Sequence, residues 1–149
     1  DNAQHVSEKL SLLAEQKILD NVDSILDNKT KFINQEHTKA TYAKKIEKSE
    51  GNINWNDKAP SIIGRINGLF PHPGAFFNYN GERYKILRAE IGNGIGKAGE
   101  VLNNKLEVAC TGNQSIKILE IQRQGKRPQK IGEFMLGSQI KKGSIIINV

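Results

Sequence analysis

Basic side chains are the residues of this sequence best suited to chemistry with a ligand. Twelve candidates gather in short clusters: Lys44, Lys45, Lys48, Arg83, Lys85, Arg88, Lys97, Lys126, Arg127, Lys130, Lys141 and Lys142. Such cations bind phosphates through charge and hydrogen bonds. One cluster alone is more simply a solvated face. Several clusters in one small domain favour a polyanionic partner, nucleic acid above all.

The positive charge is concentrated in the later part of the chain. The net charge is +6 over 149 residues. Residues 1–40 hold five Lys against seven Asp or Glu, a net charge of −2, so the remaining residues carry +8. A basic surface without a nucleic-acid role stays open from charge alone.

A glycine pattern at Gly94–Gly99 matches the GxGxxG of dinucleotide-binding loops. That motif acts by opening a helix, so that the pyrophosphate meets the helix N-terminus. Here the following residues, Glu100–Leu102, predict a strand instead. We interpret the pattern as a flexible loop between strands, in which Lys97 is free to contact a phosphate.

Neither a metal site nor a catalytic site is predicted. His5, His37 and His72 fall in a helix start, a linker and a proline turn, without the convergent spacing that zinc requires. No nucleophile elbow or Walker loop occurs. The single cysteine, Cys110, is expected to be a buried structural thiol.

Composition predicts a globular protein of ordinary class. Hydrophobic residues make up 37% and charged residues 26%, which excludes a disordered tail. No apolar run approaches the roughly 20 residues that span a bilayer, so no membrane partner is expected. The first residues lack the pattern of a secretion signal, and we expect a cytoplasmic protein.

Helical signals occupy the first part of the chain. Apolar residues recur at helical spacing over 6–26, which predicts a helix, in two pieces, whose packing partner lies elsewhere. Residues 31–40 are predicted as a linker and 41–50 as a short basic helical turn. Pro60 opens a second helix over 61–69, which the prolines of 71–74 end.

Strand signals follow from residue 75 onward. Strands are predicted at 75–79, 82–91, 100–102, 106–111 and 115–122, with a short helix at 131–136 and an extended end at 145–147. Asn80-Gly81 and Gly112-Asn113 mark tight turns. The fold class is therefore α+β with a mainly β core: an N-terminal helical segment and linker, followed by a small barrel like the oligonucleotide-binding (OB) fold.

Alternation along the strand at 82–91 places Arg83 and Lys85 on one face and Tyr84 and Ile86 on the other. Four aromatic residues are candidates for base stacking, although most are expected in the core: Phe70, Phe76, Phe77 and Tyr79.

Several segments resemble the C-terminal portion of methionyl-tRNA formyltransferases. The similarity begins at "TYAKKIEKSEGNINWNDKAPSIIGRINGLFPHPGAFF", residues 41–77, and continues through "YKILRAE", "GEVL", "LEVACTGN", "ILEIQRQGKRPQ" and "EFMLG". It covers essentially the whole chain, with residues 1–28 similar to the end of the preceding catalytic domain. Two positions depart from the family pattern, Asn54 in place of Asp and Asn67 in place of Arg.

The resemblance implies a parent enzyme that transfers a formyl group from 10-formyltetrahydrofolate to initiator methionyl-tRNA. The family's catalytic Asn, His and Asp lie in an earlier, Rossmann-like domain, so this chain is expected to bind no cofactor and to be inactive alone. The resemblance also implies that residues 1–40 are the remnant of the catalytic domain with the linker and that residues 41–149 are the tRNA-binding domain. The implied partners are initiator tRNA and the N-terminal catalytic domain. The alternatives are a barrel from a sugar formyltransferase or formyltetrahydrofolate dehydrogenase, and a scaffold domain.

Overall fold

The first helix, α1 (Ala3–Leu26), runs unbroken for 24 residues in the computed structural model, which describes residues 1–147. The prediction of two helical pieces was therefore wrong. The helix is continuous because residues 3–26 contain neither glycine nor proline. Its start is fixed by Asn2, whose side chain accepts a hydrogen bond of 2.9 Å from the backbone N–H of His5.

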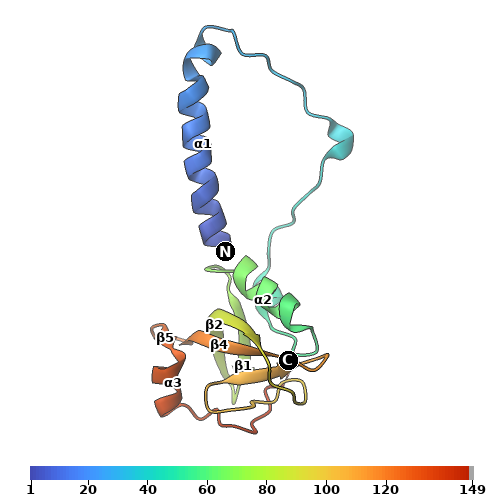
Figure 1. The fold of residues 1–149 in the computed structure, drawn as a ribbon, viewed down its shortest axis with the longest axis vertical. Helices are drawn as coiled ribbons and strands as arrows, with labels where there is room; N and C mark the ends of the chain where they lie inside the picture. The colour runs from blue at the N-terminus through green and yellow to red at the C-terminus, as the bar shows by residue number, and fades with distance from the viewer. Residues whose placement is uncertain (148–149) are drawn as a thin grey trace.

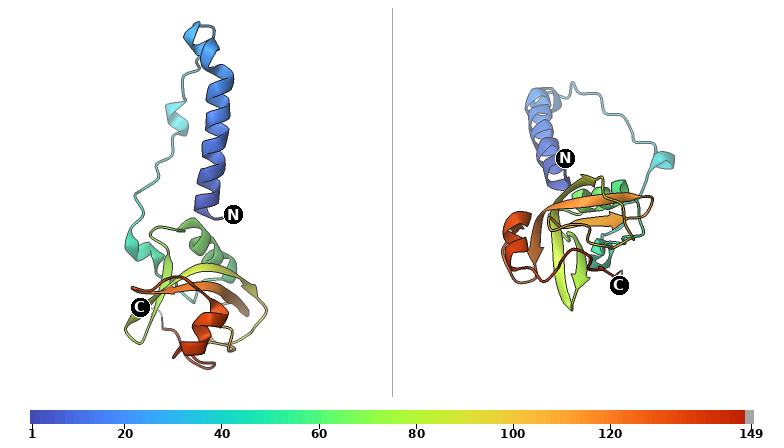
Figure 2. Two further views of the ribbon diagram at one scale, coloured as in Figure 1. Left: turned by 90° about the vertical axis from the view of Figure 1, so that its left-hand side faces the viewer. Right: turned by 60° about the horizontal axis from the view of Figure 1, so that its bottom comes forward.

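The apolar face of α1 is uncovered. Figures 1 and 2 show the helix extending away from the sheet, with only its N-terminal end close to the second helix, α2 (Ala59–Gly68). No residue of α1 is buried, and Leu10 and Leu13 are 60% and 55% exposed. A helix of this kind is normally stabilised by packing its apolar face.

Between α1 and α2 the chain is extended apart from two single turns of 3-10 helix, His37–Lys39 and Lys48–Gly51. Residues 31–40, predicted as a linker, contain no regular structure apart from the turn at His37–Lys39. The basic helical turn predicted for 41–50 forms only from Lys48 onward. Residues 41–47 have no apolar face to pack, because Tyr42 and Ile46 both point to solvent.

The helix α2 confirms the second predicted helix and covers the sheet. Pro60 lies in its first turn, where its missing N–H costs nothing. Ile62 and Ile66, one turn apart, are 1% exposed and pack into the core. The turn of residues 69–74 then leads into the sheet.

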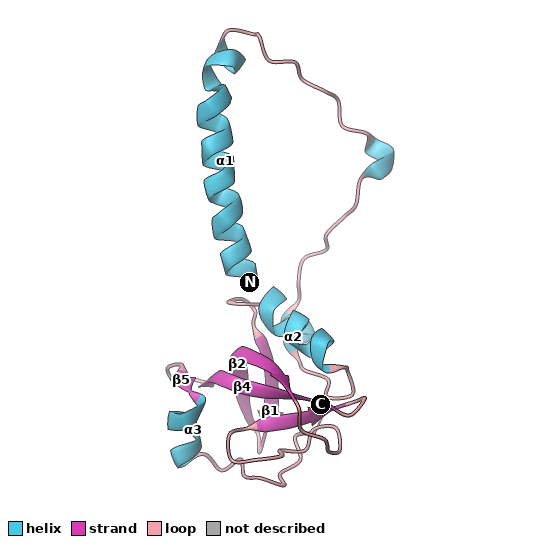
Figure 3. Ribbon diagram, in the orientation of Figure 1, coloured by secondary structure: helices cyan, strands magenta, loops and turns pink. Residues whose placement is uncertain are grey.

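Five antiparallel strands form the body of the fold (Figure 3): β1 (Ala75–Tyr79), β2 (Glu82–Gly92), β3 (Glu107–Cys110), β4 (Gln114–Arg123) and β5 (Gln129–Lys130). Their order is β1-β2-β4-β3, and β5 also pairs with β4. The hairpin turns are confirmed: Asn80 and Gly81 have φ of 49° and 77°, and Gly112 and Asn113 have 75° and 55°. Positive φ at both central residues suits the twist of a hairpin.

The strand predicted at 100–102 is reduced to two isolated bridges, Val101 with Val108 and Glu100 with Ile145. Only a few residues separate the glycine loop from the turn at 103–105, which leaves no length for a full strand. The named strands pair along an open path. The structure thus establishes a fold of helices and an antiparallel sheet, but it does not establish the predicted closure of that sheet into a barrel.

The core lies between α2 and the inner face of the sheet. Ring contacts run from Trp55 to Phe77 (5.9 Å between centroids), from Phe77 to Tyr84 (5.4 Å), and on to Phe134 (5.8 Å) in the last helix, α3 (Ile131–Gly137). Cys110 is 2% exposed, as predicted. This aromatic row joins the linker, the sheet and α3 into one unit.

Candidate nucleic-acid interface

The twelve predicted cations lie at the surface, and none of them takes part in an ion pair within residues 1–147. Eleven are exposed, and Lys85 is half-buried. Within residues 1–147, none of them has a carboxylate side chain within 4.0 Å, whereas six other Lys and Arg residues do. Their charges are therefore available to an external anion.

Strand β2 presents its cations outward, as alternation predicted. Arg83 is exposed and Lys85 half-buried, whereas Tyr84 and Ile86 point into the core. The register with β4 shifts on both sides of Arg88, so the regular alternation is interrupted there. Arg88 is exposed, as Arg83 is, although its even position would place it on the inner face of a regular strand.

Sheet pairing unites these residues with the cluster that follows β4. Arg88 pairs in register with Glu120, which pairs in turn with Lys130 on β5. We call the resulting surface the basic face; it comprises Arg83, Lys85, Arg88, Lys126, Arg127 and Lys130. Two clusters more than 35 positions apart in sequence therefore form one surface.

The turn after β4 is held tightly against β2. The backbone N–H of Gln124 donates to the carbonyl of Arg83 at 2.9 Å, and that of Lys126 donates to the carbonyl of Arg123 at 3.0 Å. The side-chain amide of Gln122 donates to the Lys126 carbonyl at 2.8 Å. These bonds fix the backbone that carries Lys126.

A groove crosses the basic face, lined by Arg83, Lys85, Gln122, Arg123, Gln124 and Gly125. The guanidinium carbon of Arg83 lies 4.1 Å from the ring centroid of Phe76, a cation–π contact that orients it. Arg123 was not among the predicted residues, and it is paired with Glu82. Only the pairing of β2 with β4, which brings together two residues 41 positions apart in sequence, reveals that contact.

Glu82 is the acidic border of this groove. Its pairing with Arg123, together with a hydrogen bond of 2.8 Å from the Tyr84 hydroxyl, holds the pKa of Glu82 below its ordinary value. Burial, and then the same carboxylate, raise the pKa of Tyr84 to about 12. The carboxylate therefore stays ionised and engaged, leaving Arg83 and Lys85 as the cations that an anion would meet.

We call Lys44, Lys45 and Lys48, in the segment between α1 and α2, the linker lysines, and two of them lie next to the basic face. Lys45 and Lys48 line a pocket with His72 and Pro73. The aliphatic part of Lys85 covers the adjoining Gly74, where an added Cβ would lie 2.6 Å from its Cδ. Gly74 therefore connects the linker lysines with strand β2.

Within residues 1–147, Lys97, Lys141 and Lys142 share no strand pairing, hydrogen bond or pocket with the residues of the basic face. Lys97 occupies the glycine loop after β2, and the lysine pair occupies a turn in which the Ser144 N–H donates to the carbonyl of Lys141 at 3.0 Å. The sequence listed all twelve as candidates, and the strand pairing that unites the basic face does not include these three.

Sequence reasoning missed Arg65, which anchors the linker. Its guanidinium donates to the carbonyls of Glu50 at 3.1 Å and Asn52 at 3.0 Å, and lies 3.6 Å from the Asp57 carboxylate. Nearby, the side chain of Asn54 accepts from the Asn56 N–H at 3.1 Å, so the asparagine closes a turn as an aspartate could. No local signal in the sequence reveals the Arg65 contacts.

The aromatic candidates are mainly structural. Phe76 and Phe77 are buried, and Phe70 and Tyr79 are half-buried. Among residues 1–147, no group of three or more His, Cys, Asp or Glu side chains could hold a metal ion, and no helix is long and apolar enough to cross a membrane.

The chain is similar to proteins of a known family. The profile described as "Formyl transferase, C-terminal domain" matches residues 45–139. The methionyl-tRNA formyltransferase of Pelagibacter ubique (strain HTCC1062) is 62% identical over 149 residues, 100% of this chain and 48% of that protein. That of Rickettsia prowazekii (strain Madrid E) is 42% identical over 132 residues, 87% of this chain and 42% of that protein.

The chain therefore spans about half the length of the curated relatives that it matches. Among solved structures, HypX from Aquifex aeolicus in complex with tetrahydrofolic acid superimposes with a TM-score of 0.65. The likeness covers 84% of this chain and 23% of HypX at 16% sequence identity. At that identity the comparison shows a shared fold.

Proposed function

The chain belongs to the family of formyl transferase C-terminal domains, and we propose that it is the tRNA-binding portion of a methionyl-tRNA formyltransferase. The observation that carries this proposal is the basic face: six cations, brought together by sheet pairing and free of carboxylate partners within 4.0 Å. Such a surface matches the regular phosphates of a folded RNA, which give affinity without reading sequence. Lys44, Lys45 and Lys48 extend it along the linker.

Residues 41–149 form the tRNA-binding domain in this proposal, as a barrel of the oligonucleotide-binding type. Glu100 and Val101 continue the pairing beyond β3, and Glu100 pairs with Ile145. From the opposite edge of the sheet, the Tyr79 hydroxyl on β1 lies 3.1 Å from Ser144 Oγ. The segment at 144–145 therefore contacts both edges of the sheet, which supports closure of the sheet into a barrel. Closure would protect the backbone groups of both edge strands.

Residues 1–40 are the end of the catalytic domain and the linker. The open apolar face of α1 supports this assignment, because a large apolar surface in a folded protein is normally covered by a partner. The partner proposed is the preceding domain of the same enzyme.

The parent enzyme transfers a formyl group from 10-formyltetrahydrofolate to the amino group of initiator methionyl-tRNA, in the cytoplasm, at the start of translation. Its catalytic residues lie in the preceding domain, so the present chain holds and orients tRNA without performing chemistry. The names of the curated relatives and the folate complex of HypX support this assignment.

The test is a titration of the full chain with initiator tRNA and with an elongator tRNA at low and moderate salt. Both should bind, with affinity that falls as salt rises. Lys126→Ala with Arg127→Ala should lower the slope of log affinity against log salt by about 0.7 to 0.9 per lost phosphate contact.

The matched control is Lys9→Ala with Lys29→Ala, which removes the same charge from residues already paired with Asp1 and Asp27. This variant should bind like the unmodified chain. If no salt-sensitive binding occurs even at low salt, the tRNA role fails, and a barrel from a non-tRNA formyltransferase or a scaffold domain becomes the better explanation.

A further inference from the structure

The glycine loop Gly94–Gly99 is the one motif of the sequence that the basic face does not explain. It follows β2 and leads into Glu100 and Val101, not into a helix, so it lacks the helix N-terminus of a dinucleotide site. Its glycines must therefore serve another purpose.

Close packing accounts for the glycines. An added Cβ at Gly94 would lie 2.4 Å from Leu102 Cδ1, and one at Gly96 would lie 2.5 Å from Leu102 Cδ2. At Gly99, which has a φ of +84°, a Cβ would lie 2.3 Å from the Ile146 carbonyl oxygen. The loop is consequently wrapped tightly against its neighbours, contrary to the flexible loop that the sequence suggested.

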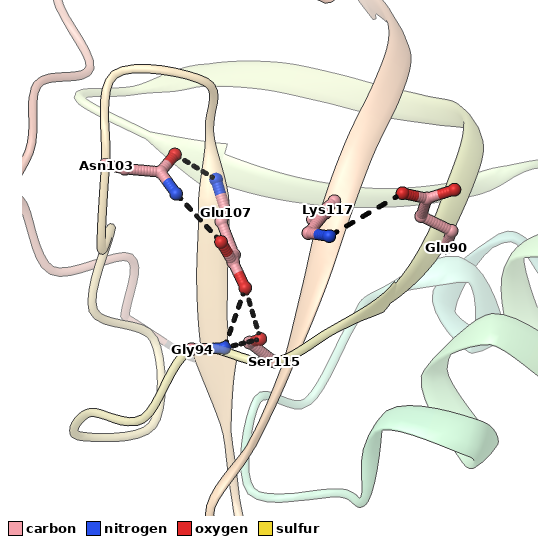
Figure 4. Close-up of polar contacts among 6 residues, drawn as sticks. All are labelled: Glu90, Gly94, Asn103, Glu107, Ser115 and Lys117. Carbon is pink, nitrogen blue, oxygen red and sulfur yellow. Dashed lines mark hydrogen bonds and ion pairs between the residues drawn. The ribbon is translucent and has the colours of Figure 1, made fainter.

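A buried carboxylate fixes the start of the loop (Figure 4). Glu107, which is 7% exposed, accepts hydrogen bonds from the Gly94 N–H at 2.9 Å, the Ser115 hydroxyl at 2.6 Å and the Asn103 amide at 2.8 Å. Ser115 also accepts from the Gly94 N–H at 2.9 Å. Two acceptors of this network, the Glu107 carboxylate and the Ser115 hydroxyl, thus share the backbone N–H of Gly94.

Glu107 is ionised at neutral pH. Burial opposes its ionisation, but the hydrogen bonds from Ser115, Gly94 and Asn103, with the charge of Lys117, together hold its pKa below the ordinary value. A buried charge contributes little net stability compared with an apolar residue of similar size. The network is therefore better explained by the fixed conformation of the Gly94–Gly99 loop than by a gain in the free energy of folding.

The residue that this loop carries outward is Lys97. Its side chain is exposed, with no carboxylate side chain of residues 1–147 within 4.0 Å, and its backbone N–H donates to Glu100 at 3.0 Å. The start of the loop at Gly94 and the backbone of Lys97 are thus both held by hydrogen bonds before any ligand binds. A preordered contact loses less conformational entropy on binding.

We propose that Glu107 is a positioning residue that holds the Gly94–Gly99 loop so that Lys97 contacts a phosphate of the bound tRNA, outside the basic face. The proposal rests on the proposed function, because it takes tRNA as the ligand. It makes the loop a second, separate contact on the same RNA.

A double-mutant cycle tests the coupling in the full chain. Lys97→Ala should weaken tRNA binding roughly three- to ten-fold at moderate salt and lower the salt slope by about 0.7 to 0.9, as expected for one phosphate contact. Glu107→Gln keeps an acceptor for Gly94 but presents an amide to Asn103, and should weaken binding by a comparable or smaller factor. In the Lys97→Ala background, Glu107→Gln should change the dissociation constant by less than about two-fold, because the two residues act through one contact.

Ser115→Ala, which removes one bond to Glu107 and one to Gly94, serves in place of Glu107→Gln if thermal unfolding shows that the glutamine variant is not folded. Lys105→Ala is the control, because it removes an exposed cation from the neighbouring turn. It should leave the affinity unchanged beyond about two-fold.

Normal salt-dependent tRNA binding with no loss in Lys97→Ala overturns this proposal and leaves the basic face intact. An equal loss from Glu107→Gln with and without Lys97 shows a purely structural role and overturns it as well. Absence of tRNA binding in the unmodified chain is a different result, since it removes the proposed function itself.

Discussion

At the scale of single residues, the buried titratable groups respond to pH in a direction that the structure fixes. Burial raises the pKa of the Cys110 thiol to about 11 and that of the Tyr84 hydroxyl to about 12. The folded state therefore retains protons that the unfolded state releases at lower pH. Each group therefore contributes its full stabilisation below its ordinary pKa. That contribution is lost as the pH rises from the ordinary pKa through the raised pKa of the folded state.

Cys110 should resist thiol reagents at neutral and mildly alkaline pH. Only the thiolate is nucleophilic, and both burial and the raised pKa oppose its formation in the folded chain. Labelling should follow the rate of unfolding and accelerate in denaturant, which a colorimetric thiol assay measures. The denatured chain gives the reference rate, and labelling of the native chain at that same rate would contradict the burial.

At the scale of elements, the contact between the linker and the turn before β1 depends on a position that tolerates no side chain. Gly51 ends the 3-10 turn, and a Cβ there would lie 2.4 Å from the Gly74 carbonyl oxygen and 3.1 Å from the Phe76 ring. Backbone and a buried ring cannot move aside easily. The linker lysines are thereby held beside β1 and β2.

Gly51→Ala should lower the free energy of unfolding by about 1 to 3 kcal/mol, the usual cost of overpacking. The matched control is Gly64→Ala, in the middle of α2, where an added Cβ meets nothing within 4 Å. That change should raise the stability by about 0.5 to 1 kcal/mol, because alanine favours a helix. Urea unfolding of both variants measures the difference, and similar effects of the two substitutions would refute the close contact.

At the scale of the whole molecule, α1 and the sheet body are thermodynamically separable. No residue of α1 is buried, whereas the aromatic row from Trp55 to Phe134 ties the later linker, sheet and α3 together. Cooperative unfolding therefore belongs to the later part of the chain. The open face of α1 adds apolar surface to the isolated chain without adding a core.

Removal of residues 1–40 should change the unfolding free energy of the remainder by less than about 0.5 kcal/mol, as for surface changes generally. It should also reduce binding of an apolar dye, because the exposed leucines of α1 are lost. Thermal unfolding and dye fluorescence check the two effects. A large drop in stability would mean that α1 packs on the sheet in solution.

Local sequence signals determined most of the elements. Pro60 located α2, Asn80-Gly81 and Gly112-Asn113 located the hairpins, and alternation assigned the two faces of β2. These signals work because φ preferences, the missing proline N–H and side-chain periodicity act within a few residues. The resemblance of the whole chain to the formyltransferase family was likewise legible in the sequence and is confirmed.

Tertiary structure alone decided which basic clusters meet and what holds the glycine loop. Arg83 and Lys126 converge through strand pairing, while Gly94 is pinned by Ser115, 21 positions away. The sequence likewise did not predict that residues 100–102 form only isolated bridges, nor did it predict the contacts of Arg65. Such contacts arise from cooperative packing of segments far apart in the chain, and no preference of a single residue or short window encodes them.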